Sequence, residues 1–202
     1  MFNFIEASMP DFKARPQQVE MSQFIADRMQ GSEHKRMAVV EAPTGVGKTL
    51  AYLAGAINTA LEQKKMLVIS TATVNLQQQL LQKDLPQFAK ATGKELKFIQ
   101  AKGRRRYLCP SKLTSVVNNK QQDLSFDVDS KYQQAKRQTR AKELFTEWDK
   151  GYWDGDRDSR SDSIAPSLWH DISTDSEGCA GKSCSKYQRC PYYLVRREMV
   201  TA

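Results

Sequence analysis

The sequence predicts an α/β fold: a partial parallel β-sheet with helices, followed by a small, mainly helical segment. Over roughly the first 100 residues, apolar β-branched runs alternate with amphipathic helical segments, which is the order of a parallel sheet with right-handed crossovers. A glycine-rich loop lies between the first such run and the helix after it. The alternation then stops, and polar segments with scattered aromatic residues follow. We therefore expect two parts of different construction.

The first expected helix begins near Pro16, because proline suits the first turn of a helix. It is expected to end at Gly31, since glycine commonly follows the last helical residue. Apolar side chains recur along it at helical spacing, at Val19, Met21, Phe24, Ile25 and Met29. This spacing gives the helix one apolar face for packing.

The loop at residues 41–49 reads Glu-Ala-Pro-Thr-Gly-Val-Gly-Lys-Thr and fits the phosphate-binding P-loop pattern, except that Ala42 replaces the first glycine. It follows an apolar strand expected at 37–40 and opens a helix expected at 49–62. In such a loop the backbone N–H groups and the helix dipole attract phosphate oxygens. Lys48 is expected to reach the β- and γ-phosphates of ATP, and the Thr49 hydroxyl to ligate Mg²⁺. The expected nucleotide-binding residues are Ala42, Pro43, Thr44, Gly45, Val46, Gly47, Lys48 and Thr49. The alternative is a chance glycine turn before a helix.

Further elements continue this order along the chain. A second buried strand is expected at residues 65–70, a helix at 74–82 that stops near Pro86, and a third strand at 96–99. In a parallel sheet of this kind the ligand binds at the carboxyl ends of the strands. We therefore expect the P-loop at that edge of the sheet.

The second part is expected to be mainly helical, with polar segments between its helices. A basic turn at 103–110 precedes a polar stretch at 118–130, a helix at 131–150, an Asp-, Ser- and Gly-rich segment at 151–178, and a last helix at 192–200. Because this part has few other core residues, we expect its tryptophans, Trp148, Trp153 and Trp169, to pack in its interior rather than to stack on bases. Ile164 and Leu168 are the other expected anchors of the polar segment.

Net charge is +8, and it is unevenly distributed. Residues 147–177 hold nine acidic and three basic side chains, so the remainder of the chain is strongly basic. A basic body favours an anionic partner such as nucleic acid, although a merely soluble basic protein fits the charge equally well. No apolar run is long enough to span a membrane, and the first residues lack the features of a secretory signal. We expect a cytoplasmic protein with no membrane partner.

Four cysteines are present, with Cys109 alone and Cys179, Cys184 and Cys190 in a C-x4-C-x5-C arrangement followed by proline. In a reducing compartment they are expected to be metal ligands or free thiols rather than disulfides. Their spacing lacks the C-x2-C pair of common zinc sites. One distant and three clustered cysteines fit a four-thiolate iron–sulfur cluster at least as well. A cluster, zinc, and free or core cysteines remain as alternatives on spacing alone.

These motifs, in this order, resemble the bacterial members of the XPD-like group of superfamily 2 DNA helicases, which carry an iron–sulfur cluster. Residues 15–18 (Arg-Pro-Gln-Gln) resemble the R-x-x-Q adenine motif, residues 41–49 resemble motif I, and residues 70–79 (Ser-Thr-Ala-Thr-Val-Asn-Leu-Gln-Gln-Gln) resemble motif Ia. The cysteine set, introduced by residues 103–110 and closed by Cys190-Pro-Tyr-Tyr, is the fourth feature. The resemblance covers essentially the whole chain.

The resemblance implies a RecA-like first motor domain at residues 1–102, an inserted iron–sulfur domain at 103–192, and at 193–202 the start of the helix that returns to the motor domain. Arg15 and Gln18 would bind the adenine of ATP. Cys109, Cys179, Cys184 and Cys190 would hold a [4Fe–4S] cluster. DNA would contact Thr71, Ala72 and Thr73 of motif Ia and, beside the cluster, Arg104, Arg105 and Arg106, although these arginines also fit a solvated basic loop.

By the same resemblance the protein is expected to be a monomeric, ATP-driven 5′→3′ helicase acting on single-stranded and forked DNA, with a role in DNA repair. The chain departs from the family in one respect: it has no Asp-Glu-Ala-His motif II and no second motor domain. Those parts supply Mg²⁺-binding carboxylates and an arginine finger. We therefore expect the 202-residue chain alone to be inactive, with the missing motor portion in the full-length protein. The alternatives are a non-catalytic nucleotide- and DNA-binding product and a P-loop NTPase with a zinc module.

Overall fold

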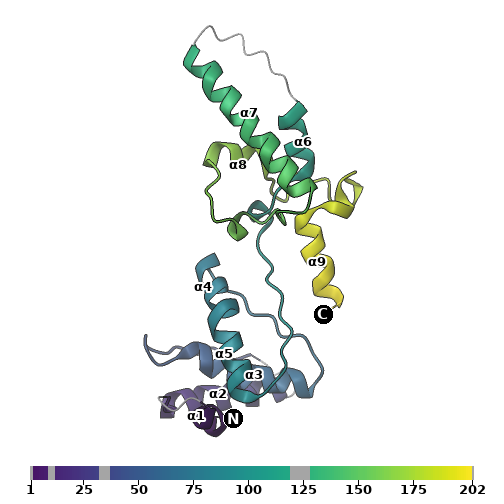
Figure 1. The fold of residues 1–202 in the computed structure, drawn as a ribbon. Coiled ribbons are helices and arrows are strands. Elements are labelled where there is room, and N and C mark those ends of the chain that lie inside the picture. The colour runs from purple at the N-terminus through teal and green to yellow at the C-terminus, as the bar shows by residue number, and fades with distance from the viewer. Residues whose placement is uncertain (1, 9–11, 32–36, 119–127, 202) are drawn as a thin grey trace. The chain divides into compact units, whose positions relative to one another are not determined.

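The computed structural model describes residues 2–8, 12–31, 37–118 and 128–201 (Figure 1). The chain forms two compact units, residues 1–98 and 99–202. The domain boundary expected after residue 102 lies a few positions from this division. Most of the polar stretch expected at 118–130 lies outside the described residues.

In the first unit, α1 (Phe2–Ser8) packs on α5 (Leu85–Thr92), and α2 (Pro16–Gln30) packs on α3 (Lys48–Glu62). Their apolar side chains form one core of Phe2, Ile5, Leu53, Ala54, Ile57, Phe88 and Ala91. The boundaries of α2 and α3 agree with the helices expected at 16–31 and 49–62. Helix α1 was not expected, since the first helix was predicted to begin near Pro16. Phe2 and Ile5 lie one helical turn apart and are both buried.

A close contact between α2 and α3 depends on Gly55. A Cβ atom at this position would lie 2.5 Å from the backbone oxygen of Ser22 and 3.1 Å from the Cβ of Ile25. No side chain larger than hydrogen fits there without moving α2. The contact matters for the site below because α2 begins in the predicted adenine motif and α3 begins in the predicted P-loop.

The helix expected at 74–82 does not stop near Pro86. It begins as α4 (Val74–Gln79) and continues beyond Pro86. A π-helical turn, Leu80–Asp84, joins it to α5, and Pro86 occupies the first turn of α5. Proline lacks the N–H of an ordinary helical residue and its ring crowds the preceding turn. A π-helical turn places that disruption in a wider turn of the backbone, so the chain stays helical to Thr92.

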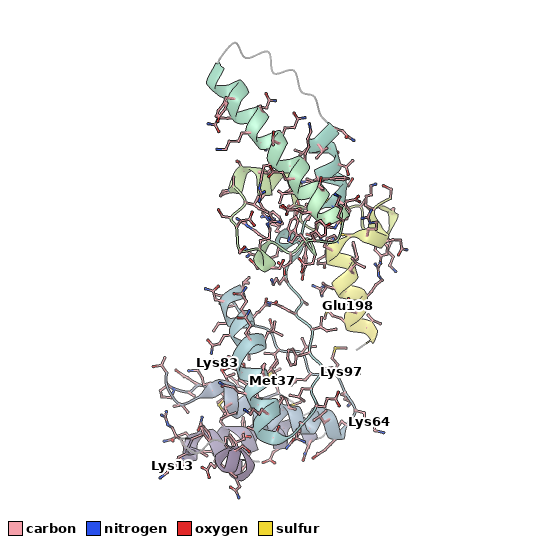
Figure 2. The ribbon with its side chains drawn as sticks, viewed as in Figure 1. Lys13, Met37, Lys64, Lys83, Lys97 and Glu198 are labelled. Atoms are coloured by element: carbon pink, nitrogen blue, oxygen red, sulfur yellow. The ribbon has the colours of Figure 1, made fainter. Side chains whose placement is uncertain are left out.

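The strands expected at residues 37–40, 65–70 and 96–99 are not formed within the described part of the chain. These segments carry large exposed side chains, with Met37 at 83%, Val39 at 87% and Val68 at 73% exposure. Figure 2 labels Met37 and Lys97 on two of them. A helix pairs its own backbone groups, whereas a strand needs another strand, which can be far away in the sequence. The described residues supply no such neighbour, so the parallel sheet remains a prediction.

One of these segments nevertheless has the side-chain alternation of a strand. Leu67 and Ile69 pack against the first core, while Met66 and Val68 are exposed. Successive side chains of an extended chain point to opposite sides. The segment at 65–70 therefore lies with one face on the helices, as an outer strand of an α/β layer would.

The second unit contains α6 (Pro110–Asn118), α7 (Val128–Asp149), α8 (Pro166–Ile172) and α9 (Pro191–Thr201). Short 3-10 turns lie at Arg104–Arg106, Arg157–Ser159, Gly181–Ser183 and Tyr187–Arg189. Figure 1 shows α6 and α7 side by side. The expected helices at 131–150 and 192–200 are confirmed. Helices α6 and α8 were not expected, although each begins at a proline, the signal used for α2.

Three tryptophans lie in the core of the second unit. Trp148, Trp153 and Trp169 pack with Leu108, Leu113, Ala141, Leu144, Ile164, Leu168 and Ile172. The indole N–H of Trp169 donates to the backbone oxygen of Arg105 at 2.8 Å, and that of Trp153 donates to the backbone oxygen of Asp156 at 2.8 Å. The expectation that the tryptophans pack is confirmed. Within the described ranges, no helix has the length and apolar character needed to cross a membrane.

Candidate nucleotide and metal-binding sites

The predicted P-loop forms a tight turn at the start of α3. Gly45 and Gly47 both have φ near +84°, in the left-handed region that favours glycine. Gly47 is the residue immediately before α3. The loop therefore has the two glycine turns and the helix start of a phosphate-binding loop, while the strand expected before it is not formed.

Lys48 lies folded over this turn. Its Nζ donates to the backbone oxygens of Ala42 at 2.8 Å and Pro43 at 3.1 Å. These two carbonyls hold the ammonium group against the loop, and a phosphate would offer it oxygens of stronger negative charge. Thr49, the next residue, is half-buried in the first turn of α3.

Arg15 and Gln18, the residues of the predicted adenine motif, contact the P-loop directly. The Gln18 amide nitrogen donates to the Gly47 oxygen at 3.3 Å, and a guanidinium nitrogen of Arg15 donates to the Gly45 oxygen. Gln18 is buried, and its amide oxygen accepts from the Arg15 backbone N–H at 3.0 Å. A Cβ at Gly47 would lie 2.1 Å from the Gln18 amide nitrogen. The two motifs are therefore one structural group.

Residues 71–73, expected at the DNA, form the start of α4. The Thr73 hydroxyl accepts from the Leu76 backbone N–H at 3.3 Å, which makes Thr73 the N-cap of this helix. The Thr71 hydroxyl donates to the Thr73 backbone oxygen at 3.1 Å. Ala72 and Thr73 are exposed. The two hydroxyl groups thus order this turn, whatever else they contact.

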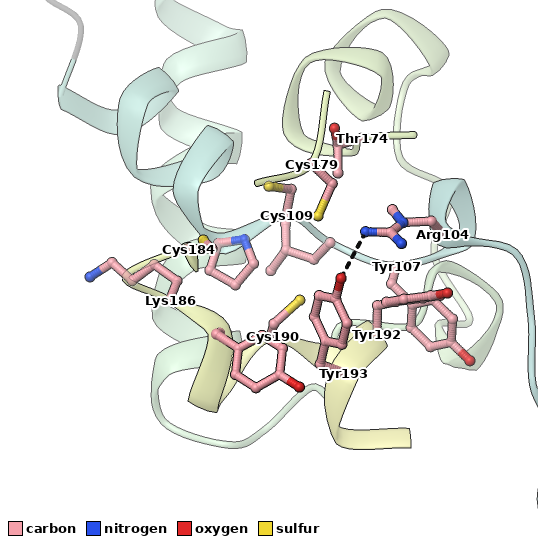
Figure 3. A pocket seen from close by; sticks show the side chains of 13 residues that line it. Arg104, Tyr107, Cys109, Thr174, Cys179, Cys184, Lys186, Cys190, Tyr192 and Tyr193 are labelled. Atoms are coloured by element: carbon pink, nitrogen blue, oxygen red, sulfur yellow. Dashed lines mark hydrogen bonds between the residues drawn. The ribbon is translucent and has the colours of Figure 1, made fainter. Parts of the chain in front are cut away.

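In the second unit, Cys109, Cys179, Cys184 and Cys190 line a single cavity (Figure 3). All four are half-buried free thiols. Burial raises the pKa of the Cys190 thiol, backbone N–H groups of Tyr193 and Tyr192 lower it, and the nearby Cys109 and Cys179 raise it further. The three clustered cysteines and the distant one therefore meet at one place.

Local structure explains how Cys109 reaches this cavity. The N–H of Leu108 donates to the Gly155 oxygen at 2.8 Å, and that of Cys109 donates to the Ile172 oxygen at 2.7 Å. Isolated antiparallel bridges join Tyr107 to Asp156 and Leu108 to Ser173. Directly after Cys109, Pro110 begins α6. These contacts hold Cys109 against the loops that lead to the other three cysteines.

A buried ion-pair group supports the same segment. Lys102, which is 4% exposed, pairs with Asp156 and, at 3.1 Å, with Asp158. Arg106 donates through Nε to Asp158 at 3.0 Å. Burial raises the pKa of Asp156, and the adjacent Lys102 opposes that rise. A buried lysine in this role has no local sequence signal, and sequence reasoning missed it.

The cavity is small, about 20 Å³. Organic cofactors occupy sites of roughly 300–1,000 Å³, so the cavity is too small to hold one. Within the described residues, no three or more His, Cys, Asp or Glu side chains are gathered closely enough to hold a metal ion. A tetrahedral zinc site would place its sulfurs about 3.8 Å apart, given the usual zinc–sulfur bond length. The four thiols share a cavity without forming such a preassembled site.

The three arginines expected to contact DNA each have partners within the second unit. Arg104 lies in the cysteine cavity, donates to the Tyr193 hydroxyl at 3.2 Å and stacks on the Tyr192 ring at 4.4 Å. Arg105 pairs with Asp175 at 2.8 Å, and Arg106 pairs with Asp158. Of the three, Arg105 is the most exposed. A DNA contact by these side chains remains a prediction, and Arg104 has a second candidate role beside the thiols.

The chain matches the family model described as DEAD/DEAH box helicase over residues 17–140. It is 40% identical over 205 aligned residues to "ATP-dependent DNA helicase DinG" of Escherichia coli (strain K12), and 38% identical to the protein of that name from Salmonella typhimurium (strain LT2). Both alignments cover the whole chain and 28% of the relative. The protein of that name from Photobacterium profundum is 41% identical over 87% of this chain and 25% of its own length. The chain thus spans about a quarter of the length of these relatives.

Proposed function

The chain belongs to the DEAD/DEAH box helicase family, and from that membership we propose that it is the ATP-binding and cysteine-bearing N-terminal portion of an ATP-dependent DNA helicase. Its relatives carry that activity in their names. A DEAD/DEAH domain implies a RecA-like α/β fold. The further properties proposed for the whole protein are 5′→3′ movement on single-stranded and forked DNA, a monomeric state, a cytoplasmic location and a remaining motor portion outside this chain.

The observation that carries the nucleotide part of this proposal is the contact between the adenine motif and the P-loop. Gln18 donates to Gly47, and Arg15 donates to Gly45. Each amide atom of Gln18 keeps one further hydrogen-bonding position, which we propose the adenine edge occupies. Adenine bound by Gln18 and Arg15 would therefore affect Gly45 and Gly47, the two glycines of the loop that would bind the phosphates. Base recognition and phosphate binding would therefore be linked through two backbone carbonyls.

Phosphate binding would begin with Lys48. The ammonium group would leave the carbonyls of Ala42 and Pro43 for the β- and γ-phosphate oxygens, which bind a cation more strongly than neutral carbonyls do. Thr49 would offer its hydroxyl to Mg²⁺. Hydrolysis also needs carboxylates that hold Mg²⁺ and an arginine finger, which raises rates by about 10³–10⁵. The chain has no Asp-Glu-x-His sequence. We therefore propose that the isolated chain binds ATP without hydrolysing it, and that hydrolysis occurs only in the complete protein.

The cysteine cavity supports the proposal of a [4Fe–4S] cluster. Four thiols line it, and it is too small for an organic cofactor. Thr174 also lines it, and the buried hydroxyl of that residue has no hydrogen-bond partner among the described residues. Cysteines bound to the separate irons of a cluster need not approach as closely as ligands of one ion. The residues present therefore fit a compact sulfur-rich group, with Cys109, Cys179, Cys184 and Cys190 as ligands.

Such a cluster supplies a one-electron redox couple and cross-links distant parts of the chain. The chain's own residues do the rest. Lys102 and its two aspartates fix the segment that carries Cys109. Arg104 places a positive charge beside the thiols, and its ring partners Tyr192 and Tyr193 hold it there. Zinc in place of a cluster would make the protein a P-loop NTPase with a zinc module, and the metal content distinguishes the two.

The test uses the complete protein with its natural metal. We expect ATP hydrolysis to require single-stranded DNA and unwinding to proceed on forks with a 5′ tail but not on forks with only a 3′ tail. Lys48→Ala should abolish both activities, whereas Lys97→Ala, an exposed lysine of the same unit, should leave them unchanged. Hydrolysis that is independent of DNA, or unwinding from a 3′ tail, would refute the proposal.

A further inference from the structure

The charge of the chain changes sign where the segment of the last three cysteines begins. Residues 147–177 hold nine acidic and three basic side chains, whereas residues 178–202 hold five basic side chains and one acidic. The basic part includes the 3-10 turn Tyr187–Arg189 and helix α9. Helix α9 was expected only to return the chain to the motor domain, and that role does not require its positive charge.

Three tyrosine rings form a continuous row on this part of the second unit. The ring centroid of Tyr187, in the 3-10 turn, lies 4.5 Å from that of Tyr193. The centroid of Tyr193 lies 5.1 Å from that of Tyr192, and both residues belong to the first turn of α9. All three tyrosines are half-buried, so each keeps part of its surface accessible.

Two arginines of α9 lie on this row of rings. The guanidinium carbon of Arg196 is 5.1 Å from the ring centroid of Tyr192, and that of Arg197 is 5.5 Å from the ring centroid of Tyr187. Arg197 also donates to the backbone oxygen of Gln188 at 2.7 Å. These partners are neutral, so they hold the guanidinium groups in position without cancelling their charge.

Two arginines of the basic turn at 103–110 are held differently. Arg105 pairs with Asp175, and Arg106 pairs with Asp158. A phosphate that bound either side chain would have to displace a carboxylate. The α9 arginines are half-buried and are held by neutral groups, which compete less strongly with a phosphate. Positive charge available to an anion is therefore greater on α9 than on those two residues of the turn.

Arginine layered on tyrosine suits one kind of anion in particular. A nucleic-acid base stacks on an aromatic ring or on the plane of a guanidinium group, and the N–H groups of arginine bind phosphate oxygens. A single strand presents unpaired bases next to its phosphates, and it is commonly bound by aromatic rings along a basic surface. A free phosphate or an acidic peptide would use the charge but not the rings.

We propose that Tyr187, Tyr192, Tyr193, Arg196 and Arg197 form a binding surface for single-stranded nucleic acid, which we call the α9 face. Bases stack on the layered rings and guanidinium groups, while the two arginines contact phosphates. The inference rests on the helicase function proposed above and assigns part of the bound strand to the second unit. It moves the main contact of that unit from the basic turn to α9.

The experiment measures how tightly the complete protein, with its natural metal, binds a fluorescent oligothymidine strand at several salt concentrations. One variant combines Arg196→Gln with Arg197→Gln. The matched control combines Lys136→Gln with Lys142→Gln, which removes the same charge from exposed positions of α7. Iron content and tryptophan fluorescence are measured first, to show that each variant is folded.

The arginine variant should bind the single strand about tenfold more weakly. Each phosphate contact with a single strand contributes about 0.7 to the slope of log affinity against log salt concentration. Loss of two contacts should therefore reduce that slope by about 1.4, and the control should keep the wild-type slope and affinity. If the double variant loses its iron, Arg196→Gln alone carries the same expectation, with a slope change of about 0.7.

The contribution of the rings is tested by Tyr187→Leu and Tyr187→Phe. Leucine removes the stacking surface without changing the charge, whereas phenylalanine keeps the ring. The probes are the oligothymidine strand and an abasic strand of equal length. Tyr187→Leu should bind oligothymidine more weakly than wild type does and the abasic strand equally well. Tyr187→Phe should bind both strands as wild type does.

Wild-type affinity and salt slope in the arginine variant overturn the α9 face, and so does a larger loss of binding in Arg105→Gln. An equal loss of binding to blunt duplex DNA also overturns it, because the arginines then attract any phosphate backbone. Equal weakening of Tyr187→Leu on both strands overturns the stacking of bases. Wild-type protein that does not bind single-stranded DNA overturns the proposed function together with this inference, so the two failures are distinguishable.

Discussion

The two units of the chain differ in how completely their large apolar side chains are buried. In residues 1–98, large apolar side chains at Met37, Val39 and Val68 face outward from extended segments. In residues 99–202, all three tryptophans of the chain are buried in one core. The second unit has no more regular strand structure than the first within the described residues; two isolated bridges are its only sheet-like pairing there. Lack of a sheet therefore does not by itself leave the large apolar side chains of a unit exposed.

In the second unit, polar side chains and cysteines connect the loops and hold them around the core. Lys102 is buried against two aspartates, and four cysteines meet at one cavity. The first unit relies instead on helices whose backbone is paired internally, with extended segments that need strands to complete them. The comparison teaches that polar side-chain links substitute for a sheet where the sequence supplies them. Four changes of decreasing effect test this contrast.

The largest effect is expected from Cys109→Ser. Loss of one of four ligands should release the metal. Metal binding contributes about 10 kcal/mol or more of folding free energy in small metal-bound domains. We expect iron to be lost and trypsin to cleave within residues 99–202 while the first unit stays resistant. Ser185→Ala, between two of the cysteines, should behave as wild type. Full iron content in Cys109→Ser would exclude Cys109 as a ligand.

Lys102→Met is expected to have the next largest effect. Removing one partner of a buried ion pair costs about 3–5 kcal/mol, because the remaining charges stay buried. All tryptophans lie in the second unit, so urea unfolding followed by tryptophan fluorescence reports on that unit alone. Lys150→Met, at an exposed lysine, should cost little. Equal midpoints for the two variants would show that the ion pairs do not close the unit.

In the first unit, Thr73→Ala tests how far a helix depends on its own end. Loss of the N-cap hydroxyl should destabilise α4 by about 1 kcal/mol, measured as faster hydrogen exchange at the Leu76 amide. Thr73→Ser keeps the acceptor and should exchange as wild type. If Thr73→Ala weakens DNA binding while Thr73→Ser does not, the hydroxyl and not the methyl group matters. Unchanged exchange in Thr73→Ala would remove the N-cap assignment.

The smallest effect concerns Asp175. The Gly178 N–H and, after it, Arg105 hold the pKa of this carboxyl at about 2. Because the pKa is depressed, the stabilisation is present above the ordinary aspartate value and is lost as the pH falls toward 2. Carboxyl ¹³C NMR from pH 6 to pH 3 should show almost no protonation in wild type. In Arg105→Ala the titration should begin at higher pH, and an identical curve would exclude the ion pair.

The elements that sequence analysis located have local causes. Pro16 and Gly31 delimit α2, and the glycines of the P-loop take the left-handed turns that only glycine adopts easily. Burial of the tryptophans followed from the scarcity of other core residues. Each of these features depends on residues within a few positions of one another or on composition.

The features that sequence analysis missed depend on distant contacts. Pro86 reads as a helix end, but the π-helical turn before it allows the helix to continue. From its sequence neighbours, Lys102 looks like a solvent-exposed lysine, but two aspartates more than fifty positions away pair with it in the interior. Thr174 is an ordinary loop threonine until the fold brings it to the cysteines. The expected strands are the reverse case, since their pattern is local but their pairing is not.

The most direct test of this account is the metal and sulfide content of the complete protein purified without oxygen. The account predicts about four irons and four acid-labile sulfides per chain, as in a cluster held by four cysteines, and little zinc. One zinc per chain without sulfide would contradict it. The cysteine cavity would then be a zinc site, and the protein would be a P-loop NTPase with a zinc module.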